Sequence, residues 1–588
     1  MIQINKRKIG FAVIQINKRK IGMCILLSIV TLGIYEIYWM YLLVKNNRSL
    51  KGNTESCTGE MLCLMFVPFY SLYWWYTRGT RMKYEFVKYK HNASGSGILY
   101  LILELLGLGI VSMAIMQNDF NSLKSEGFSE RFGGSIFAPT DMTVGAPWKS
   151  IVMFTLPMLI GNIAQQLYNT VDSIVVGKYI GDNALASVGS AAPILNMLLV
   201  LFIGISAGAS IMVSQYFGAK NRKSLSYTIG TCITVTAIAC VLLIIVAAPL
   251  IRPVLVALNT PETIIDGCAD YLLISLYGIA GMAYYNILSG VIRGMGDSFS
   301  TLVYLLVATV INIILDVYFV AGLGMGVGGV ALATVIAQIV SSVLCFIKLS
   351  RMREYFDFGV KYLKPEMRFV KTIIRLGIPS GLTQAIFSSA MIIVQSLTNQ
   401  FGELFIAANV VIMRVDGFAM MPNFSFGMAL TTYAGQNVGA GLYDRVTKGA
   451  KQGTLIAVGC STVITGIILL FGKSLMGVFT DTDELVDTSY YLMKILAAGY
   501  IAVAVTQSLS GIMRGAGDTM TPMWISLITT VVFRVPIAYG ISFLTRTAEL
   551  PVGRSECIQI SLLSSWVLGA VLTTIFYGMG KWKTKAIK

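Results

Sequence analysis

The chain has 588 residues, of which 55% are hydrophobic and only 13% are charged, and its mean hydropathy is +0.72. Soluble domains carry roughly 25% charged residues, so this composition excludes a water-soluble enzyme, a disordered chain and a nucleic-acid-binding module. It predicts an all-α polytopic membrane protein, since helices satisfy their own backbone in lipid. The single His and the nine Cys show no metal-site or disulfide spacing, and the net charge of +16 therefore has to be explained by topology.

Residues 1–118 are predicted to form an N-terminal module with two to three membrane segments. Its apolar stretches are residues 21–44, 61–77 and 98–116. Aromatic residues, among them Trp39, Trp74 and Trp75, lie near the ends of these stretches and are predicted to sit at the level of the lipid headgroups. Three crossings would place Met1 outside the cell, against the local basic charge, so the number of crossings stays open.

The first residues of this module contain a short tandem copy. Residues 2–10 recur as residues 14–22, a spacing too short for a structural repeat. We interpret the copy as a local duplication or an overlong start, with a basic face beside the membrane as the alternative.

A polar segment, residues 119–147, is predicted to link the module to a unit of twelve helices. The apolar segments of this unit are residues 150–176, 185–215, 226–250, 269–291, 300–321, 327–347, 372–399, 404–434, 452–478, 488–511, 521–544 and 558–578. Counting loops alternately, one side collects about twenty Lys and Arg residues and the other about five. We therefore expect a cell-membrane protein in which both ends of the twelve-helix unit are cytoplasmic.

The most informative pattern is an internal repeat with a spacing of about 221 residues. Gly290-Val-Ile-Arg-Gly-Met-Gly-Asp-Ser298 returns as Gly511-Ile-Met-Arg-Gly-Ala-Gly-Asp-Thr519, and Gln215-Tyr-Phe-Gly-Ala219 returns as Gln436-Asn-Val-Gly-Ala440. The repeat predicts two parallel six-helix halves, residues 148–360 and 361–588, related by a pseudo-two-fold axis along the membrane normal. Halves of this kind can rock about a central cleft, which favours a transporter over a duplicated channel or scaffold.

The repeated Arg-Gly-x-Gly-Asp sequences are expected to be tight turns. They lack the Gly-Lys-Ser/Thr ending of a phosphate-binding loop. Glycine permits a positive φ there, and Asp297 or Asp518 can cap the helix that follows.

Few charged residues lie well inside the membrane segments, where charge is costly and usually faces a cavity or a partner. In the first half these are Asp172 and Asp316, and Asn312 shares the helix face of Asp316. Shifted by the repeat spacing, these positions fall on apolar residues and near Arg534. Acids that served structure common to both halves should occur twice, so we predict an ion or proton site in the first half. Helix capping or hydrogen bonding to a neighbouring helix is the alternative for each acid.

In the second half, Arg414 and Asp416 are two residues apart and so do not face each other on a helix. Asp416 is a candidate for attracting a cationic substrate, and a structural ion pair is the competing interpretation. Met420 lies on the same segment, among Met and Phe residues of a kind that forms adaptable binding surfaces. Helix packing is the alternative for Met420.

Taken in chain order, several motifs resemble the multidrug and toxic compound extrusion (MATE) family over residues 148–580. They are Thr170 to Gly177 after Pro157, Gln215 to Ala219, Gly290 to Asp297, Asn312 to Asp316, Gly328 to Thr334 and Arg514 to Asp518. The resemblance implies drug/Na⁺ or drug/H⁺ antiport on two six-helix lobes, with Asp172, Asn312, Asp316 and Thr334 as the cation or proton site.

The second half departs from the members of the family that place acids there. Gln384 stands in the corresponding region of the seventh segment, and the tenth segment has no carboxylate between Tyr490 and Gly511. This departure favours coupling in the first half and adds Gln384 to the candidate substrate contacts Arg414, Asp416 and Met420. Residues 25–39 with 118–122 separately resemble a small bacterial membrane domain of unknown function.

We therefore predict a secondary antiporter, acting as a monomer, that exports amphipathic or cationic drugs or toxic compounds in exchange for Na⁺ or H⁺. No cofactor or metal is expected apart from the coupling ion, and no nucleic-acid partner. The alternatives are a lipid-linked precursor flippase of the same superfamily, which usually needs a strongly basic cleft, and a non-transporting membrane scaffold. An enzyme is not expected, because the sequence has no nucleophile–base constellation.

Overall fold

The computed structural model describes residues 21, 24, 34–49, 60, 61, 63, 64, 70–87, 95–105, 109–122, 139–258, 260–480 and 482–587. The chain divides into two compact units, residues 1–138 and 139–588. The duplicated N-terminal segment, apart from Ile21, and residues 123–138 of the predicted linker lie outside the described residues.

The described helices of the first unit are α2 (Ile34–Ser49), α4 (Tyr70–Val87), α5 (Gly97–Leu105) and α6 (Gly109–Ser122). The indole of Trp39 donates to the side-chain oxygen of Gln117 at 3.2 Å, which joins α2 to α6. Trp39, Trp74 and Trp75 are each at most 2% exposed. These three rings are packed inside the unit, and their place at the level of the lipid headgroups stays a prediction. How many times the unit crosses the membrane stays a prediction.

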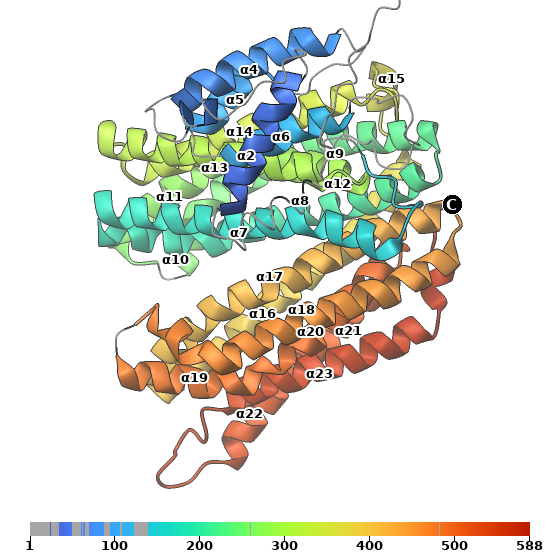
Figure 1. The fold of residues 1–588 in the computed structure, drawn as a ribbon. Helices are drawn as coiled ribbons and strands as arrows, with labels where there is room; N and C mark the ends of the chain where they lie inside the picture. Colours follow the sequence, from blue (N-terminus) through green and yellow to red (C-terminus); the bar gives the residue numbers. More distant parts are fainter. Residues whose placement is uncertain are drawn as a thin grey trace, which may run out of the picture. The chain divides into compact units, whose positions relative to one another are not determined.

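The second unit is built mainly of long helices (Figure 1). Its first half has α7 (Pro147–Tyr179), α8 (Asp182–Gly218), α9 (Arg222–Ala247), α10 (Ile251–Ala257), α11 (Glu262–Tyr277), α12 (Ile279–Gly294), α13 (Ser298–Asp316) and α14 (Gly326–Arg351). Its second half has α16 (Met367–Thr398), α17 (Glu403–Gly439), α18 (Tyr443–Gly477), α19 (Asp483–Ala497), α20 (Gly499–Gly515), α21 (Met520–Leu527), α22 (Arg534–Leu544) and α23 (Cys557–Gly578). The short helix α15 (Val360–Leu363) lies between the halves in sequence.

Ten helices of the described chain are long and apolar enough to cross a membrane, and the number is twelve if each of two bent pairs is one span. The bent pairs are α11 with α12, at 52°, and α19 with α20, at 45°. They occupy equivalent places in the two halves, which confirms the prediction of two six-helix groups. We call the first group, α7 to α14, the N-lobe, and the second, α16 to α23, the C-lobe.

The repeated turns have the predicted form in both lobes. Gly296 and Gly517 have positive φ values of 93° and 97°. The side chain of Asp297 accepts from the backbone N–H of Ser300 at 2.9 Å, and Asp518 accepts from that of Thr521 at 3.3 Å. The prediction that these acids cap the following helices is confirmed.

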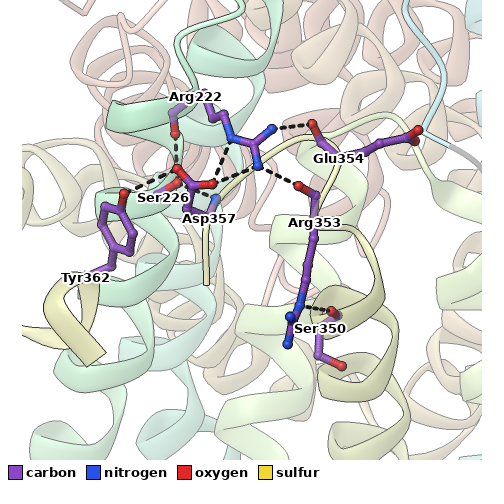
Figure 2. A network of polar contacts seen from close by, with 7 residues as sticks. All are labelled: Arg222, Ser226, Ser350, Arg353, Glu354, Asp357 and Tyr362. Atoms are coloured by element: carbon purple, nitrogen blue, oxygen red, sulfur yellow. Dashed lines mark hydrogen bonds and ion pairs between the residues drawn. The ribbon is translucent and has the colours of Figure 1, made fainter. Parts of the chain in front are cut away.

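The segment between the lobes is fixed to the N-lobe at the start of α9 (Figure 2). Arg222 donates to the carboxylate of Asp357 at 2.7 and 3.0 Å and to the carbonyl oxygens of Glu354 and Arg353 at 2.7 and 2.6 Å. Ser226 accepts from the backbone N–H of Asp357 at 2.8 Å. Further along, the hydroxyl of Thr234 on α9 donates to the carbonyl of Leu363 at 2.6 Å.

Replacing Asp357 with asparagine is expected to loosen this segment at neutral pH. The hydrogen bonds from Arg222 hold the pKa of the Asp357 carboxyl below its ordinary value. Because the pKa of Asp357 is lower in the folded state, its contact with Arg222 stabilises the protein at pH values above the ordinary pKa of aspartate. This contribution is lost as the pH falls through the pKa of the folded state. We expect trypsin to cleave several-fold faster after Arg353 and Lys361 in Asp357→Asn. Glu354→Gln, which removes a neighbouring negative charge, is the control and should leave the cleavage rate unchanged.

Candidate functional site

The predicted acidic residues of the N-lobe lie together on neighbouring helices. Asp172 is on α7, and Asn312 and Asp316 are on the last turns of α13, just before a π-helical segment, Val317–Gly322. Asn312 and Asp316 have exposed fractions of 0%, and Thr334 on α14 has one of 8%. The carboxyl group of Asp316 lies close enough to that of Asp172 to interact with it electrostatically. The structure thus brings together all four residues that the sequence assigned to this site.

Hydrogen bonds fix the neutral members of this cluster. The amide of Asn312 donates to the hydroxyl oxygen of Thr334 at 3.4 Å. The phenol of Tyr168 on α7 donates to the same oxygen at 3.1 Å. These bonds join α7, α13 and α14 and orient the side-chain oxygen of Asn312 away from Thr334.

Several oxygen atoms in the cluster have no donor within the described chain. They are Oδ1 of Asp172, Oδ1 of Asn312 and both carboxyl oxygens of Asp316, each of them buried. An ionised carboxylate in such a place costs several kcal/mol unless a partner neutralises it. A hydrogen bond between two carboxyl groups requires a proton on one of them. The arrangement therefore suits either a monovalent cation held by these oxygens or a proton shared between the acids.

Sequence reasoning missed two tyrosines beside the acids. Tyr168 and Tyr271 both interact electrostatically with Asp172 and Asp316 and are buried. Tyr168 lies four residues before Asp172 and so shares its face of α7, a spacing that could have identified it. Tyr271 comes from α11, and no local pattern connects it to the acids.

The C-lobe has a different polar cluster in its interior. The phenol of Tyr500 on α20 donates to the carboxylate of Asp416 on α17 at 2.9 Å. Arg534, the first residue of α22, interacts electrostatically with Asp416. Its Nε is buried without an acceptor in the described residues. The C-lobe cluster therefore contains one acid and one cationic side chain, whereas the N-lobe cluster contains two acids.

The other candidate substrate contacts do not share this environment. Met420 is 8% exposed and belongs to the apolar core of the C-lobe. Arg414 on α17 and Gln384 on α16 are exposed. The role of Asp416 and of these three residues in substrate binding stays a prediction.

Comparisons with known proteins agree with the repeat. The MatE family matches residues 157–318 and again residues 379–540, and the domain of unknown function DUF4234 matches residues 19–69. The chain is 30% identical over 425 residues to the probable multidrug resistance protein YoeA of Bacillus subtilis, covering 71% of this chain and 92% of that protein. It is 25% identical to the probable multidrug resistance protein NorM of Thermotoga maritima, covering 75% of this chain and 94% of that protein.

Solved structures show the same fold. The crystal structure of MATE in complex with MaL6 matches with a TM-score of 0.70 at 24% identity, over 75% of this chain and 97% of that one. The outward-facing conformation of a multidrug resistance MATE family transporter also matches with a TM-score of 0.70, at 23% identity and the same coverage.

Proposed function

Because this chain belongs to the MatE family, we propose that it is a secondary antiporter that exports amphipathic or cationic compounds in exchange for Na⁺ or H⁺. Its relatives YoeA and NorM, both named as probable multidrug resistance proteins, support small-molecule drugs or toxic compounds as substrates. The excess of Lys and Arg in one set of loops supports an orientation with both ends of the twelve-helix unit in the cytoplasm.

The observation that carries this proposal is the pair of acids in the N-lobe, three of whose four carboxyl oxygens lack a donor among the described residues. A site of this kind changes its charge when it takes up a cation or a proton and so can favour different conformations when loaded and empty. Asn312 and Thr334 are proposed to orient the ligand oxygens, and Tyr168 to hold the Thr334 hydroxyl in place.

The C-lobe cluster is the proposed contact for the exported compound. Asp416 would attract a cationic substrate, while Arg534 and the Tyr500 hydroxyl would hold the carboxylate when the substrate is absent. Because these residues belong to the other lobe, substrate and coupling ion would occupy separate places in one molecule.

Transport of ethidium in proteoliposomes tests the proposal. DNA trapped inside the vesicles reports ethidium entry by fluorescence. A Na⁺ gradient at equal pH and a pH gradient at equal Na⁺ are applied separately, each with a control in which an ionophore collapses the gradient. We expect entry well above that of protein-free vesicles under one of the gradients, which identifies the ion. Equal entry with and without protein under both gradients would contradict drug antiport.

A further inference from the structure

The two repeated motifs of the sequence meet each other across the boundary between the lobes. Gln215, near the end of α8, donates from its side-chain amide to the carbonyl of Gly515 in the C-lobe turn at 2.8 Å. Gln436, near the end of α17, donates in the same way to the carbonyl of Gly294 at the N-lobe turn, at 3.3 Å. Each Gln-x-x-Gly-Ala motif therefore binds the Arg-Gly-x-Gly-Asp turn of the opposite lobe.

The amide oxygens of the two glutamines are also paired, each with a segment outside the long helices. Gln436 accepts from the backbone N–H of Met142, and Gln215 accepts from that of Ile587, both at 2.8 Å. We call residues 140–145 the leading strap and residues 585–587 the trailing strap. Each strap thus crosses to the lobe opposite the helix that it adjoins in sequence.

The leading strap has further bonds to the C-lobe. Arg445 on α18 donates to the carbonyls of Val144 and Gly145, each at 2.8 Å, and to that of Met142 at 3.1 Å. Asn437 donates to the carbonyl of Met142 at 3.2 Å. Thr140 donates from its backbone to Gly296 of the N-lobe turn at 3.3 Å. The strap is therefore held by both lobes at once.

The side chains of both glutamines are buried and have hydrogen-bond partners, so the loss of any one of these bonds costs free energy. Gln215 is 2% exposed and Gln436 is 0% exposed. A buried amide that loses its partners keeps the cost of desolvation. The contacts lie at the end of the bundle that carries the basic loops. A rocking motion that separated the lobes at this end would break the two bonds from Gln215 and Gln436 to the turns of the opposite lobe. It would also pull the leading strap between the two lobes that hold it.

We propose that Gln215 and Gln436 form two symmetry-related clasps that close this end of the transporter, and that both straps are released when it opens. This inference rests on the proposed function only in assigning the motion to a transport cycle. Closure of this end depends on residues from both lobes and therefore on the position of one lobe against the other. Loading of the N-lobe site and release of the straps are linked through that position.

Hydrogen exchange measured by mass spectrometry on the purified full chain tests the clasps directly. We expect Gln215→Ala to speed exchange in the trailing strap, and Gln436→Ala to speed it in the leading strap, by about fivefold for each net hydrogen bond lost. Gln400→Ala, at an exposed position near the opposite end of the bundle, is the matched control and should change neither strap.

A second readout separates a clasp from a merely structural contact. If the clasps set the balance between conformations, the double variant Gln215→Ala/Gln436→Ala should become more protected at the opposite end, around residues 180–182 and 399–402. Unchanged exchange in both straps would overturn the proposal. Faster exchange in the straps with no change at the opposite end would show that the glutamines only hold the straps locally and do not set the balance between conformations. Both results stand whether or not ethidium is transported, so a failure of the proposed function is distinguishable from a failure of the clasps.

Discussion

Asp172→Asn is expected to reduce gradient-driven transport to the level of protein-free vesicles, and Asp316→Asn to do the same. Asparagine matches the shape of aspartate but takes up neither a proton nor the charge of a cation. The two carboxyl groups interact with each other and lack donors for three of their oxygens, so neither acid can replace the other. The measurement is ethidium entry under the gradient that drives the unmodified protein.

The control for this prediction is Asp416→Asn in the other lobe. It should retain dependence on the ion gradient while weakening the response to cationic ethidium. Both N-lobe variants should fold, since neutralising a buried, unpaired carboxylate removes a desolvation cost, and their thermal midpoints should not fall. Wild-type transport by Asp172→Asn in folded protein would place ion coupling elsewhere in the molecule.

Gly218→Ala is expected to destabilise the protein strongly for so small a change, and Gly439→Ala to behave alike. A Cβ on Gly218 would overlap the carbonyl oxygen of Gln436, and a Cβ on Gly439 would overlap that of Gln215. These obstacles are backbone atoms of the opposite lobe, so α8 and α17 would have to move apart. Overpacking of this kind costs about 1–3 kcal/mol, which should appear as a lower midpoint of thermal unfolding followed by tryptophan fluorescence.

Gly459→Ala is the matched control on α18, because a Cβ there meets no atom within 4 Å. Alanine favours a helix over glycine by about 1 kcal/mol, so the control should be unchanged or slightly more stable. Equal midpoints for Gly218→Ala and Gly459→Ala would show that the lobes do not touch at Gly218 in solution.

The twelve-helix architecture followed from the sequence because each membrane segment carries its own signal. Length and hydropathy identify a span without knowledge of its neighbours, and the capping roles of Asp297 and Asp518 depend only on adjacent residues. The N-lobe acids were predictable for a similar reason, since a charge inside an apolar segment is conspicuous. The packing of Trp39, Trp74 and Trp75 was not, because a large ring suits both a lipid interface and a protein core.

Contacts that join distant helices were beyond sequence reasoning. Tyr271 reaches the acids from α11, and Tyr500 reaches Asp416 from α20, through the way in which the helices pack. Gln215 and Gln436 were visible as repeated residues, but the repeat relates each to its equivalent and does not show that each contacts the other lobe. A repeated motif therefore identifies residues at equivalent positions in the two lobes, but it does not show which residues they contact.

The attachment of the segment between the lobes to α9 determines where the two lobes can pivot. Residues up to Leu363 are bonded to the N-lobe, whereas α16 begins at Met367. Lys364, Pro365 and Glu366 join the two elements, in extended conformation at Lys364 and Glu366. The attachment continues into α16, because Phe369, Ile373 and Leu376 pack in the apolar core of the N-lobe. A helix of 32 residues such as α16 is about 48 Å long, so a change of about 10° in its direction displaces its far end by about 8 Å. A small rotation of α16 where it leaves the N-lobe core is therefore amplified along the rest of the helix.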